Sequence, residues 1–458
     1  MPGPKGLPFI GQALDLFKNA NNPNAYFTEL ANQYGDFVKI KLLNNKMVIL
    51  SDPKAVRELA RGEEGRLTLH ASRHYKLEKG MIRVTMDYFN HENWNDIRQV
   101  LNIPLKPQYF NEVILPQLTE LNNELLKSFV NTLKFDENSK QYYFADPMYD
   151  IMSQFAFSAV IKVFLGVKVT EKELIEKLGF TVRQYIKDAV DTTDLILKLQ
   201  YQPGLYKYGY KTKDYKDFEE LSDISFGRGF KLVDLLSDRY DGKIPRLKEL
   251  VEERAKMAGF LSEATTTVLS AFMIGGVDVT ARMMTTLLYR IAHEKEWAQK
   301  LYEETAQVFG EPTADELTMD SVIPVRNSRL LTKDTILGAY KLEKGTQVLF
   351  LDVPSVQSKY VPRGIEFLPE RHIKGSEISE PKDYLGPFGT GARKCPGERV
   401  ATNEIYFALI ALVRHFKLTH SNGNEFPPFS VEKSMYYMDP TKYRVFFTPR
   451  DHLLPYFK

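Results

Sequence analysis

Residues 387–397 read PFGTGARKCPG, and a run with the apolar periodicity of a helix follows them. The spacing F-x-x-G-x-R-x-C-x-G is met at each fixed position, by Phe388, Gly391, Arg393, Cys395 and Gly397. A cysteine thiolate is stabilised by nearby N–H donors, which a glycine-rich backbone at a helix N-terminus provides. The stretch therefore predicts that Cys395 is a thiolate ligand of a metal ion.

Arg393 lies two residues before the sulfur and can form a charge-assisted pair with a haem propionate. An isolated cysteine is more often a buried hydrophobic residue than a ligand, but five fixed positions in register make coincidence a poor explanation. We therefore interpret Cys395 as the sulfur ligand of a haem iron. The sequence contains one cysteine, which excludes an intramolecular disulfide framework.

The composition is that of an ordinary globular protein. Hydrophobic residues make up 43% of the 458 residues and charged residues 26%, which argues against disorder. The 29 Phe and 25 Tyr can fill a large core and line an apolar ligand cavity. The net charge is +2, and no basic stripe interleaved with aromatics is present, so we expect no nucleic-acid partner.

No segment of the sequence predicts a transmembrane helix. The longest uninterrupted apolar run, residues 406–413, is far shorter than the roughly 20 residues that a bilayer requires. The first residues, MPGP, also lack the charged and apolar regions of a targeting leader. Either the protein needs no leader, or the leader is absent from this sequence.

The periodicity along the chain predicts an α-rich α+β protein. Short β-type runs at residues 37–40 and 47–50 predict a small sheet near the N-terminus. Helical spacing extends from residue 112 to about residue 309, β-type runs return at 337–350 and 431–447, and residues 398–416 are helical again. Because no repeat or low-complexity linker interrupts the sequence, we expect one domain over residues 1–458.

A long central helix is expected over residues 247–292, where helical periodicity exceeds the usual length of roughly 8 to 20 residues. Gly275 and Gly276 stand in its middle, and Asp278 follows them. Adjacent glycines cost a helix roughly 1 kcal/mol each relative to alanine, so the pair requires a reason. Close packing of a neighbouring helix is the simplest one.

With these features in place, the sequence resembles the cytochrome P-450 family of haem-thiolate monooxygenases over nearly its whole length. The stretch around Cys395 is similar to the family's cysteine loop, and residues 369–371, PER, are similar to the stretch that precedes it. The resemblance implies the family fold, in which a long central helix lies over the haem and a small β region is N-terminal. It also implies heme b, iron protoporphyrin IX, as the cofactor.

The resemblance further implies which residues hold the cofactor. Trp94 and Arg98 match a W-x-x-x-R pair whose side chains hydrogen-bond the haem propionates, and their i, i+4 spacing places both on one helix face. Arg329 matches a strand arginine that contacts a propionate. The implied cofactor contacts are Trp94, Arg98, Gly276, Arg329, Phe388, Gly389, Arg393 and Gly397.

A finer resemblance is to the mitochondrial branch of the family. It rests on residues 64–66, Arg73, Tyr75, residues 78–80 and residues 104–107. That branch takes electrons from a small acidic ferredoxin, commonly acts on sterols, steroids or secosteroids, and associates peripherally with the mitochondrial inner membrane. The alternative is kinship with the microsomal branch, which implies a flavoprotein reductase and the endoplasmic reticulum membrane.

The central helix departs from the family pattern. The family reads A/G-G-x-D/E-T-T there, and its first threonine helps to deliver protons to the bound oxygen. Val279 stands at that position here, and the hydroxyl comes one residue later, at Thr280, about 100 degrees further round the helix. Asp278 remains as the acid, so we predict Asp278 and Thr280 as the catalytic residues of the relay.

A second departure is a gap in the chain. Between residues 317–322 and 324–329 the family carries a helix with E-x-x-R, and this sequence has no room for it. In the family, that Glu and Arg hold the arginine that corresponds to Arg371 in a buried charge network. Loss of a partner from such a network typically costs roughly 3 to 5 kcal/mol, so we expect weak haem retention.

The sequence supports three functional hypotheses. The first is a monooxygenase that inserts one atom of O2 into an apolar small molecule with electrons from a redox partner. The second, motivated by Val279, is a haem-thiolate isomerase or dehydratase that takes a peroxide substrate. The third, motivated by the gap, is an inactive truncated variant. A metal site at His70 and His74 is weaker, because no third ligand accompanies their spacing.

Overall fold

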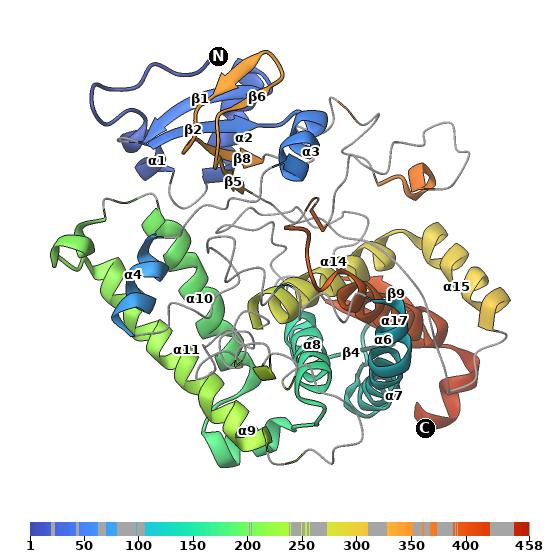
Figure 1. Ribbon diagram of the computed structural model, residues 1–458. Helices are drawn as coiled ribbons and strands as arrows, with labels where there is room; N and C mark the ends of the chain where they lie inside the picture. The colour runs from blue at the N-terminus through green and yellow to red at the C-terminus, as the bar shows by residue number, and fades with distance from the viewer. Residues whose placement is uncertain are drawn as a thin grey trace.

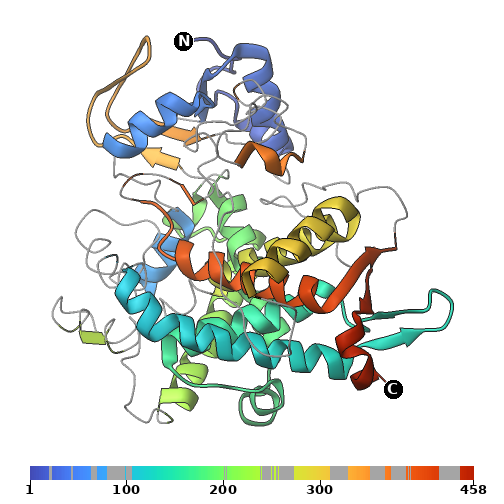
Figure 2. The ribbon, with the colours of Figure 1, turned by 90° about the vertical axis from the view of Figure 1, so that its right-hand side faces the viewer.

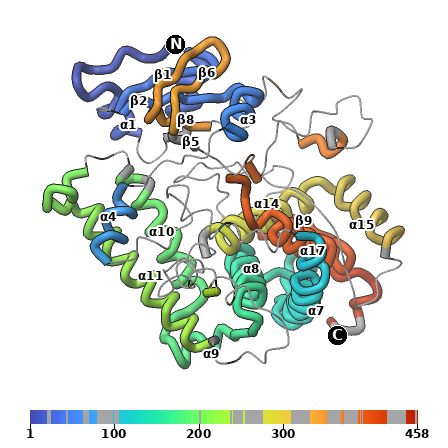
Figure 3. The backbone as a smooth tube through the Cα atoms, in the orientation of Figure 1, coloured from blue at the N-terminus to red at the C-terminus, as the bar shows by residue number. Residues whose placement is uncertain are grey.

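The computed structural model describes residues 1–19, 23–42, 45–62, 70–79, 98, 106–200, 202, 204–237, 239, 249, 252–253, 256, 273–309, 328–350, 360, 367–372, 388–389, 391, 393–421 and 444–457. Figure 1 shows a small β-rich part at the top of the view, which holds the N-terminus, and a larger helical part below it. The tube in Figure 3 follows the same division. This arrangement agrees with the predicted α-rich α+β class.

The β-rich part is built on a four-stranded sheet with the strand order β1-β2-β8-β5. β1 (Phe37–Leu42) and β2 (Asn45–Leu50) are antiparallel, and β8 (Gln347–Phe350) joins β2 in parallel. β5 (Ser328–Leu330) is antiparallel to β8. The small sheet predicted near the N-terminus is confirmed, and a distant segment of the chain supplies two of its strands.

Alternation of side chains along β1 explains how this sheet is covered. Val38, Ile40 and Leu42 are buried, and the lysines between them are exposed. The buried side chains pack against α2 (Pro23–Tyr34). The other helices of this part are α1 (Ala13–Lys18) and α3 (Pro53–Gly62).

Seven longer helices make up most of the helical part. They are α7 (Leu115–Thr132), α8 (Met148–Leu165), α10 (Val182–Gln200), α11 (Lys213–Ser237), α14 (Val279–His293), α15 (Lys295–Phe309) and α17 (Glu398–His415). α14 contacts both α8 and α17, while α17 also contacts α7 and α15. Figure 2 shows α17 and α7 running side by side across this part. The predicted helix at residues 398–416 is confirmed as α17.

Shorter elements connect these helices. They are α4 (His70–Glu78), α6 (Pro107–Tyr109), η2 (Phe110–Ile114), α9 (Glu171–Leu178), η3 (Leu205–Tyr208), η4 (Met273–Asp278), η5 (Pro369–His372) and η6 (Asp451–Phe457). The π-helix η4 runs directly into α14. Of the central helix predicted over residues 247–292, the part from Met273 onward is described as one helical stretch, whereas most of residues 247–272 lie outside the described residues.

A hairpin interrupts the stretch that we predicted as mostly helical. β3 (Lys134–Asp136) pairs with β4 (Gln141–Tyr143), and the second sheet has the order β3-β4-β10-β9. The Asp136 carboxylate accepts hydrogen bonds from the Asn138 N–H and the Ser139 hydroxyl, which holds a turn where a helix would otherwise continue. The other strands of this sheet are β9 (Phe416–His420) and β10 (Val445–Pro449), and β6 (Thr335–Leu337) with β7 (Tyr340–Leu342) forms a separate hairpin.

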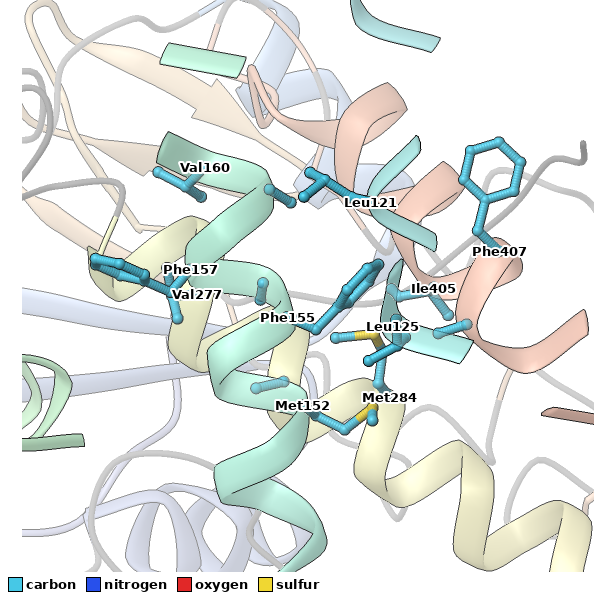
Figure 4. Packing of buried hydrophobic residues seen from close by; sticks show 14 of the residues in the cluster. Leu121, Leu125, Met152, Phe155, Phe157, Val160, Val277, Met284, Ile405 and Phe407 are labelled. Carbon is cyan, nitrogen blue, oxygen red and sulfur yellow. The ribbon is translucent and has the colours of Figure 1, made fainter. Parts of the chain in front are cut away.

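Four helices supply the core of the helical part. Figure 4 shows Leu125, Met152, Phe155, Met284 and Ile405, which come from α7, α8, α14 and α17 and converge in one cluster. Full burial of one such side chain contributes about 1.5 to 3 kcal/mol. Among the described residues, α8 is long and apolar enough to cross a membrane, but 67% of it is buried here, as in a core helix. The core therefore fixes α14 between α8 and α17.

Candidate functional site

The loop before α17 is closed by its own backbone. The Cys395 N–H donates to the Phe388 carbonyl at 2.8 Å, and the Lys394 N–H donates to the Gly391 carbonyl at 3.1 Å. Gly389 and Gly391 both have φ of 75°, a left-handed conformation that glycine adopts without strain. The predicted glycine-rich loop is thus a compact turn that presents Cys395 just ahead of α17.

The groups around the Cys395 thiol act on its pKa in opposite directions. Burial raises its pKa, whereas the Gly397 backbone N–H and the positive charge of Arg98 act in the opposite direction. A cation next to the sulfur would overcome the cost of burial and hold the group as a thiolate. The surroundings of Cys395 therefore fit a metal-bound sulfur, and they bring together Cys395, Gly397 and Arg98 from the predicted set.

The other predicted cofactor contacts are only partly described. Arg393 is 5% exposed, and a buried guanidinium requires anionic or polar groups around it, as a haem propionate would be. Phe388, in the same loop, is also buried. Arg329 lies in β5 opposite Val348, and Trp94 lies outside the described residues. The loop and Arg98 are the members that the structure places near the sulfur.

Gly391 also allows the cysteine loop to touch α3. A Cβ atom at Gly391 would lie 1.9 Å from the Ala60 carbonyl oxygen. We expect Gly391→Ala to lower the free energy of unfolding by about 2 to 5 kcal/mol, from roughly 1 to 2 for the left-handed backbone and about 1 to 3 for overpacking. Urea unfolding and the haem content of the purified protein measure the effect.

Gly345→Ala is the matched control for that substitution. Gly345 has φ of 81°, and no described atom lies within 4 Å of the position of its Cβ. The control should therefore show only the backbone cost, roughly 1 to 2 kcal/mol, and keep its haem. Equal losses in the two variants would contradict the role of the contact between Gly391 and Ala60.

The glycine pair of the central helix faces two directions. A Cβ at Gly276 would lie 3.0 Å from Val160 Cγ2 of α8, whereas a Cβ at Gly275 would have no atom of the described residues within 4 Å, and Gly275 is exposed. The π-helix η4 widens the chain at this point, a feature that often marks functional sites. The role of Gly276 as a cofactor contact stays a prediction; in the structure Gly276 packs against α8, and Gly275 lies on the exposed side.

Val279 and Thr280, four residues after the two glycines, also lie on different sides of the helix. Val279, one turn after Gly275, is partly exposed, and Thr280, one turn after Gly276, is 2% exposed. A shift of one residue turns a side chain by about 100 degrees, so the two cannot share a face. The Thr280 hydroxyl therefore lies on the buried side of the helix, while an apolar side chain occupies the position nearest the open side.

Asp278 is the centre of a buried polar cluster. Its side chain is 2% exposed, and the Arg282 Nε donates to both carboxylate oxygens, at 2.9 and 3.0 Å. The Tyr149 hydroxyl, from the first turn of α8, donates to the same carboxylate. The Arg282 guanidinium carbon lies 5.1 Å from the Tyr149 ring centroid. The carboxylate thus has two partners that hold it in one orientation.

Of these two partners, only Arg282 could have been predicted from the sequence. Arg282 stands at i+4 from Asp278, so a helical ion pair could have been inferred from spacing alone. Tyr149 is 129 residues away, and only the packing of α8 on η4 brings it to Asp278. No local pattern in the sequence marks it.

The described part of the stretch before the cysteine loop contains a buried carboxylate oxygen that lacks a hydrogen bond. The Glu370 Oε2 atom, in η5, is buried and forms no hydrogen bond with any residue that the structure describes. Arg371 is the next residue in that element, and the gap near residues 322–324 lies outside the described residues. A buried carboxylate oxygen without a donor is costly, at about 1 to 3 kcal/mol or more.

His70 and His74 have other surroundings in α4. The His74 ring centroid lies 5.2 Å from that of Tyr206, and the His74 Nε2 is 3.5 Å from Glu78. In the described part of the chain, no group of three potential metal-ligating side chains occurs. Aromatic packing accounts for the place of His74.

The sequence profile of the cytochrome P450 (P-450) family matches residues 1–447 of the 458. The chain belongs to the cytochrome P-450 family. It is 25% identical to a probable cytochrome P-450 49a1 of Drosophila melanogaster, over 92% of this chain and 78% of the relative. A probable mitochondrial cytochrome P-450 12b2 of the same organism is 26% identical, over 72% of this chain and 65% of the relative. Cytochrome P-450 2E1 of Oryctolagus cuniculus is 23% identical, over 91% and 87%.

Membership in the family confirms the coarse reading of the sequence. The cytochromes P-450 bind haem and act as haem-thiolate monooxygenases, which use O2 and a redox partner. The helix-rich structure with small sheets agrees with the family fold. The enzyme is thus an oxidoreductase of the monooxygenase class.

Proposed function

We propose that this cytochrome P-450 inserts one oxygen atom of O2 into an apolar substrate of the sterol or steroid class, with electrons from a ferredoxin-type partner. The cysteine loop carries the proposal: Cys395 is placed at the start of α17, with the Gly397 N–H and Arg98 around its sulfur. In a site of this kind the metal-bound sulfur is a negatively charged thiolate, and an apolar ligand can lie beside it. The 458 residues would form one domain.

Heme b is the proposed cofactor, with Cys395 as the ligand of its iron. Arg98, Arg393, Trp94 and Arg329 would neutralise its propionates, and Phe388, Gly389 and Gly397 would shape the loop on its thiolate side. When bound, such a group activates O2 for insertion into a C–H bond. Gly275 offers the open surface of the central helix on which a flat cofactor or substrate can lie.

Asp278 is the proposed acid of the proton relay. Its buried carboxylate, on the last residue of η4, is held by Arg282 and Tyr149. Thr280 is proposed with it as the second relay residue, and both side chains are 2% exposed. The geometry favours Asp278 as the residue that stores and releases a proton.

A ferredoxin partner and a mitochondrial location are proposed together. Relatives of this chain include several Drosophila melanogaster proteins named as mitochondrial cytochromes P-450, at 23 to 27% identity. The mitochondrial-type pattern of this sequence, which includes Arg73 and Tyr75, supports the same proposal. A flavoprotein reductase in the endoplasmic reticulum is the alternative pair.

Exposed apolar side chains support peripheral association with a membrane. Phe9 near the N-terminus and Tyr208 in η3 are each 88% exposed. The same two segments also expose Phe17 and Tyr210. Figure 1 shows the segment that holds α1, and the connection between α10 and α11, on the left-hand side of the molecule. Aromatic and apolar side chains grouped on one side fit the interfacial region of a bilayer.

A second candidate function is a haem-thiolate isomerase or dehydratase. Val279 favours it, because an apolar side chain stands where the family places a protic one, next to the open side at Gly275. A peroxide substrate already contains the O–O bond, so it needs neither O2 nor external electrons.

The experiment that separates these functions begins with the reduced carbonyl spectrum of the purified, haem-loaded protein. A thiolate band is expected. A panel of sterols and steroids is then incubated with the protein, ferredoxin, ferredoxin reductase, NADPH and labelled O2. The products should be heavier by one labelled oxygen atom. Turnover only with a flavoprotein reductase would support the alternative partner, and turnover of a hydroperoxide without NADPH would support the second function. No thiolate band would contradict both.

A further inference from the structure

The buried cluster around Asp278 contains a residue that has no assigned part in the reaction. Asp278 is 2% exposed, so it has little direct access to water. The side chains that contact its carboxylate in the described part of the chain are Arg282 and Tyr149. Both are more exposed than Asp278: the Arg282 side chain is 20% exposed, and Tyr149 is half-buried in the first turn of α8.

Chemistry distinguishes the two partners. A guanidinium keeps its protons in proteins and has no acceptor atom, so Arg282 holds the carboxylate but does not carry a proton to it. A phenol donates one hydrogen bond and accepts another at the same oxygen. Tyr149 can therefore give its hydrogen to Asp278 while its oxygen takes a hydrogen from water.

We propose that Tyr149 is the positioning residue through which Asp278 exchanges protons with solvent. This inference rests on the proposed function, in which Asp278 serves the relay. In each exchange the Tyr149 O–H bond breaks as an O–H bond forms on Asp278, and a new O–H bond forms on Tyr149 with a proton from a hydronium ion, which is left as water. Tyr149 is neutral before and after the exchange, so one proton moves from solvent to the carboxylate.

The surroundings of Tyr149 suit this task. Burial raises its pKa, and the nearby Asp278 carboxylate raises it further, so the hydroxyl keeps its hydrogen at neutral pH. The Arg282 guanidinium lies over the Tyr149 ring and restrains it. The hydroxyl is thus available as a donor in the resting state.

Tyr149→Phe removes the hydroxyl and keeps the ring. In the haem-loaded protein with ferredoxin, we expect the rate of product formation to fall at least about tenfold. Proton transfer contributes roughly 100- to 10,000-fold to a rate, and the expected loss is smaller because water can partly replace the phenol. A larger share of the electrons should leave as hydrogen peroxide. The solvent deuterium isotope effect on product formation should rise above that of the parent protein, since proton delivery becomes slower.

Tyr75→Phe is the matched control. The Tyr75 hydroxyl also donates to a carboxylate, that of Asp223 at 2.7 Å, between α4 and α11. Tyr75→Phe removes the same kind of hydrogen bond and leaves the contacts of Asp278 unchanged. We expect its electron coupling and isotope effect to equal those of the parent protein. Equal changes in the two variants would overturn the proposal.

A second measurement does not depend on turnover. With 13C-carboxyl aspartate, the infrared band of Asp278 is identified by its loss in Asp278→Asn. That band should shift in Tyr149→Phe and stay in place in Tyr75→Phe, and an unmoved band in Tyr149→Phe would overturn the proposal. This readout holds even where a variant loads haem poorly, and even if the proposed substrate class is wrong.

A conservative replacement tests the hydroxyl itself. 3-Fluorotyrosine at position 149 keeps the shape and the hydroxyl of tyrosine, so it should restore coupling to within about twofold of the parent, which is less than 0.5 kcal/mol. Failure to restore coupling in a folded, haem-loaded protein would show that Tyr149 acts through packing alone. If the parent protein itself gives no thiolate band, the proposed function fails first, and the infrared result still decides the contact.

Discussion

Replacing Cys395 with alanine is expected to abolish the thiolate haem spectrum of this protein. The sequence contains one cysteine, so no other side chain can supply a thiolate. Alanine carries neither the sulfur nor the negative charge that a thiolate gives to the iron. The absorption spectrum of the reduced carbonyl complex measures the change, and monooxygenase turnover should fall to the background of free haem.

Two further variants separate the role of the sulfur from that of the loop. Cys395→Ser keeps nearly the same volume but has a hydroxyl that stays protonated at neutral pH, so it should lose the thiolate band as completely as alanine does. Lys394→Ala removes the neighbouring exposed ion pair with Glu398, at 2.5 Å, and should keep the band. Retained haem with an unchanged Soret band in Cys395→Ala would refute the assignment.

The cysteine loop could be predicted because its information is contiguous. The five fixed positions of the motif lie within ten residues, and the turn that they form is closed by backbone hydrogen bonds inside the same stretch. The same reason explains the success at β1, where apolar side chains alternate, and at β2, where residues 47–50 form a continuous apolar run; both are local signals. α17 follows from its helical periodicity in the same way.

Orientation around the central helix could not be predicted. Gly276 and Gly275 are adjacent, and which of them faces the open side depends on the angle at which α8 crosses and on the widened turn of η4. Side chains rotate by about 100 degrees per residue in an α-helix, and a π-helical turn changes that register. The sequence shows the glycines but not the register.

Contacts between segments that are far apart in the sequence could not be predicted either. Tyr149 meets Asp278 across 129 residues, and β8 joins β2 from the far half of the chain. Such pairings are set by how whole helices and strands pack. The hairpin β3–β4 was missed for a different reason, because a turn held by Asp136 outweighs the helical spacing on either side of it.

The second large prediction concerns the gap near residues 322–324, which lies outside the described residues. In the family, the E-x-x-R helix holds the arginine that corresponds to Arg371. The neighbouring Glu370 Oε2 is buried without a hydrogen-bond partner among the described residues, which fits a stretch that has lost a partner. We expect the 458-residue chain to retain haem poorly, because a ligand set without its supporting groups holds its cofactor loosely.

Insertion of an E-x-x-R helix between Val322 and Pro324 should therefore restore haem binding. Recovery of a buried charge network is worth roughly 3 to 5 kcal/mol. Unfolding entropy is about 2.1 cal/mol/K per residue, so for a chain of 458 residues the thermal midpoint should rise by roughly 3 to 5 °C. Haem per polypeptide and the thermal midpoint, measured for the two chains under identical conditions, test the prediction.

The control is an inserted helix of the same length in which glutamine replaces Glu and Arg. It restores the chain length and the packing surface but not the charges, so it should recover less haem than the E-x-x-R insertion. Equal recovery would assign the effect to packing rather than to Arg371. Full and stable haem occupancy in the chain without any insertion would show that Arg371 has another partner, and the third hypothesis, an inactive truncated variant, would then lose its basis.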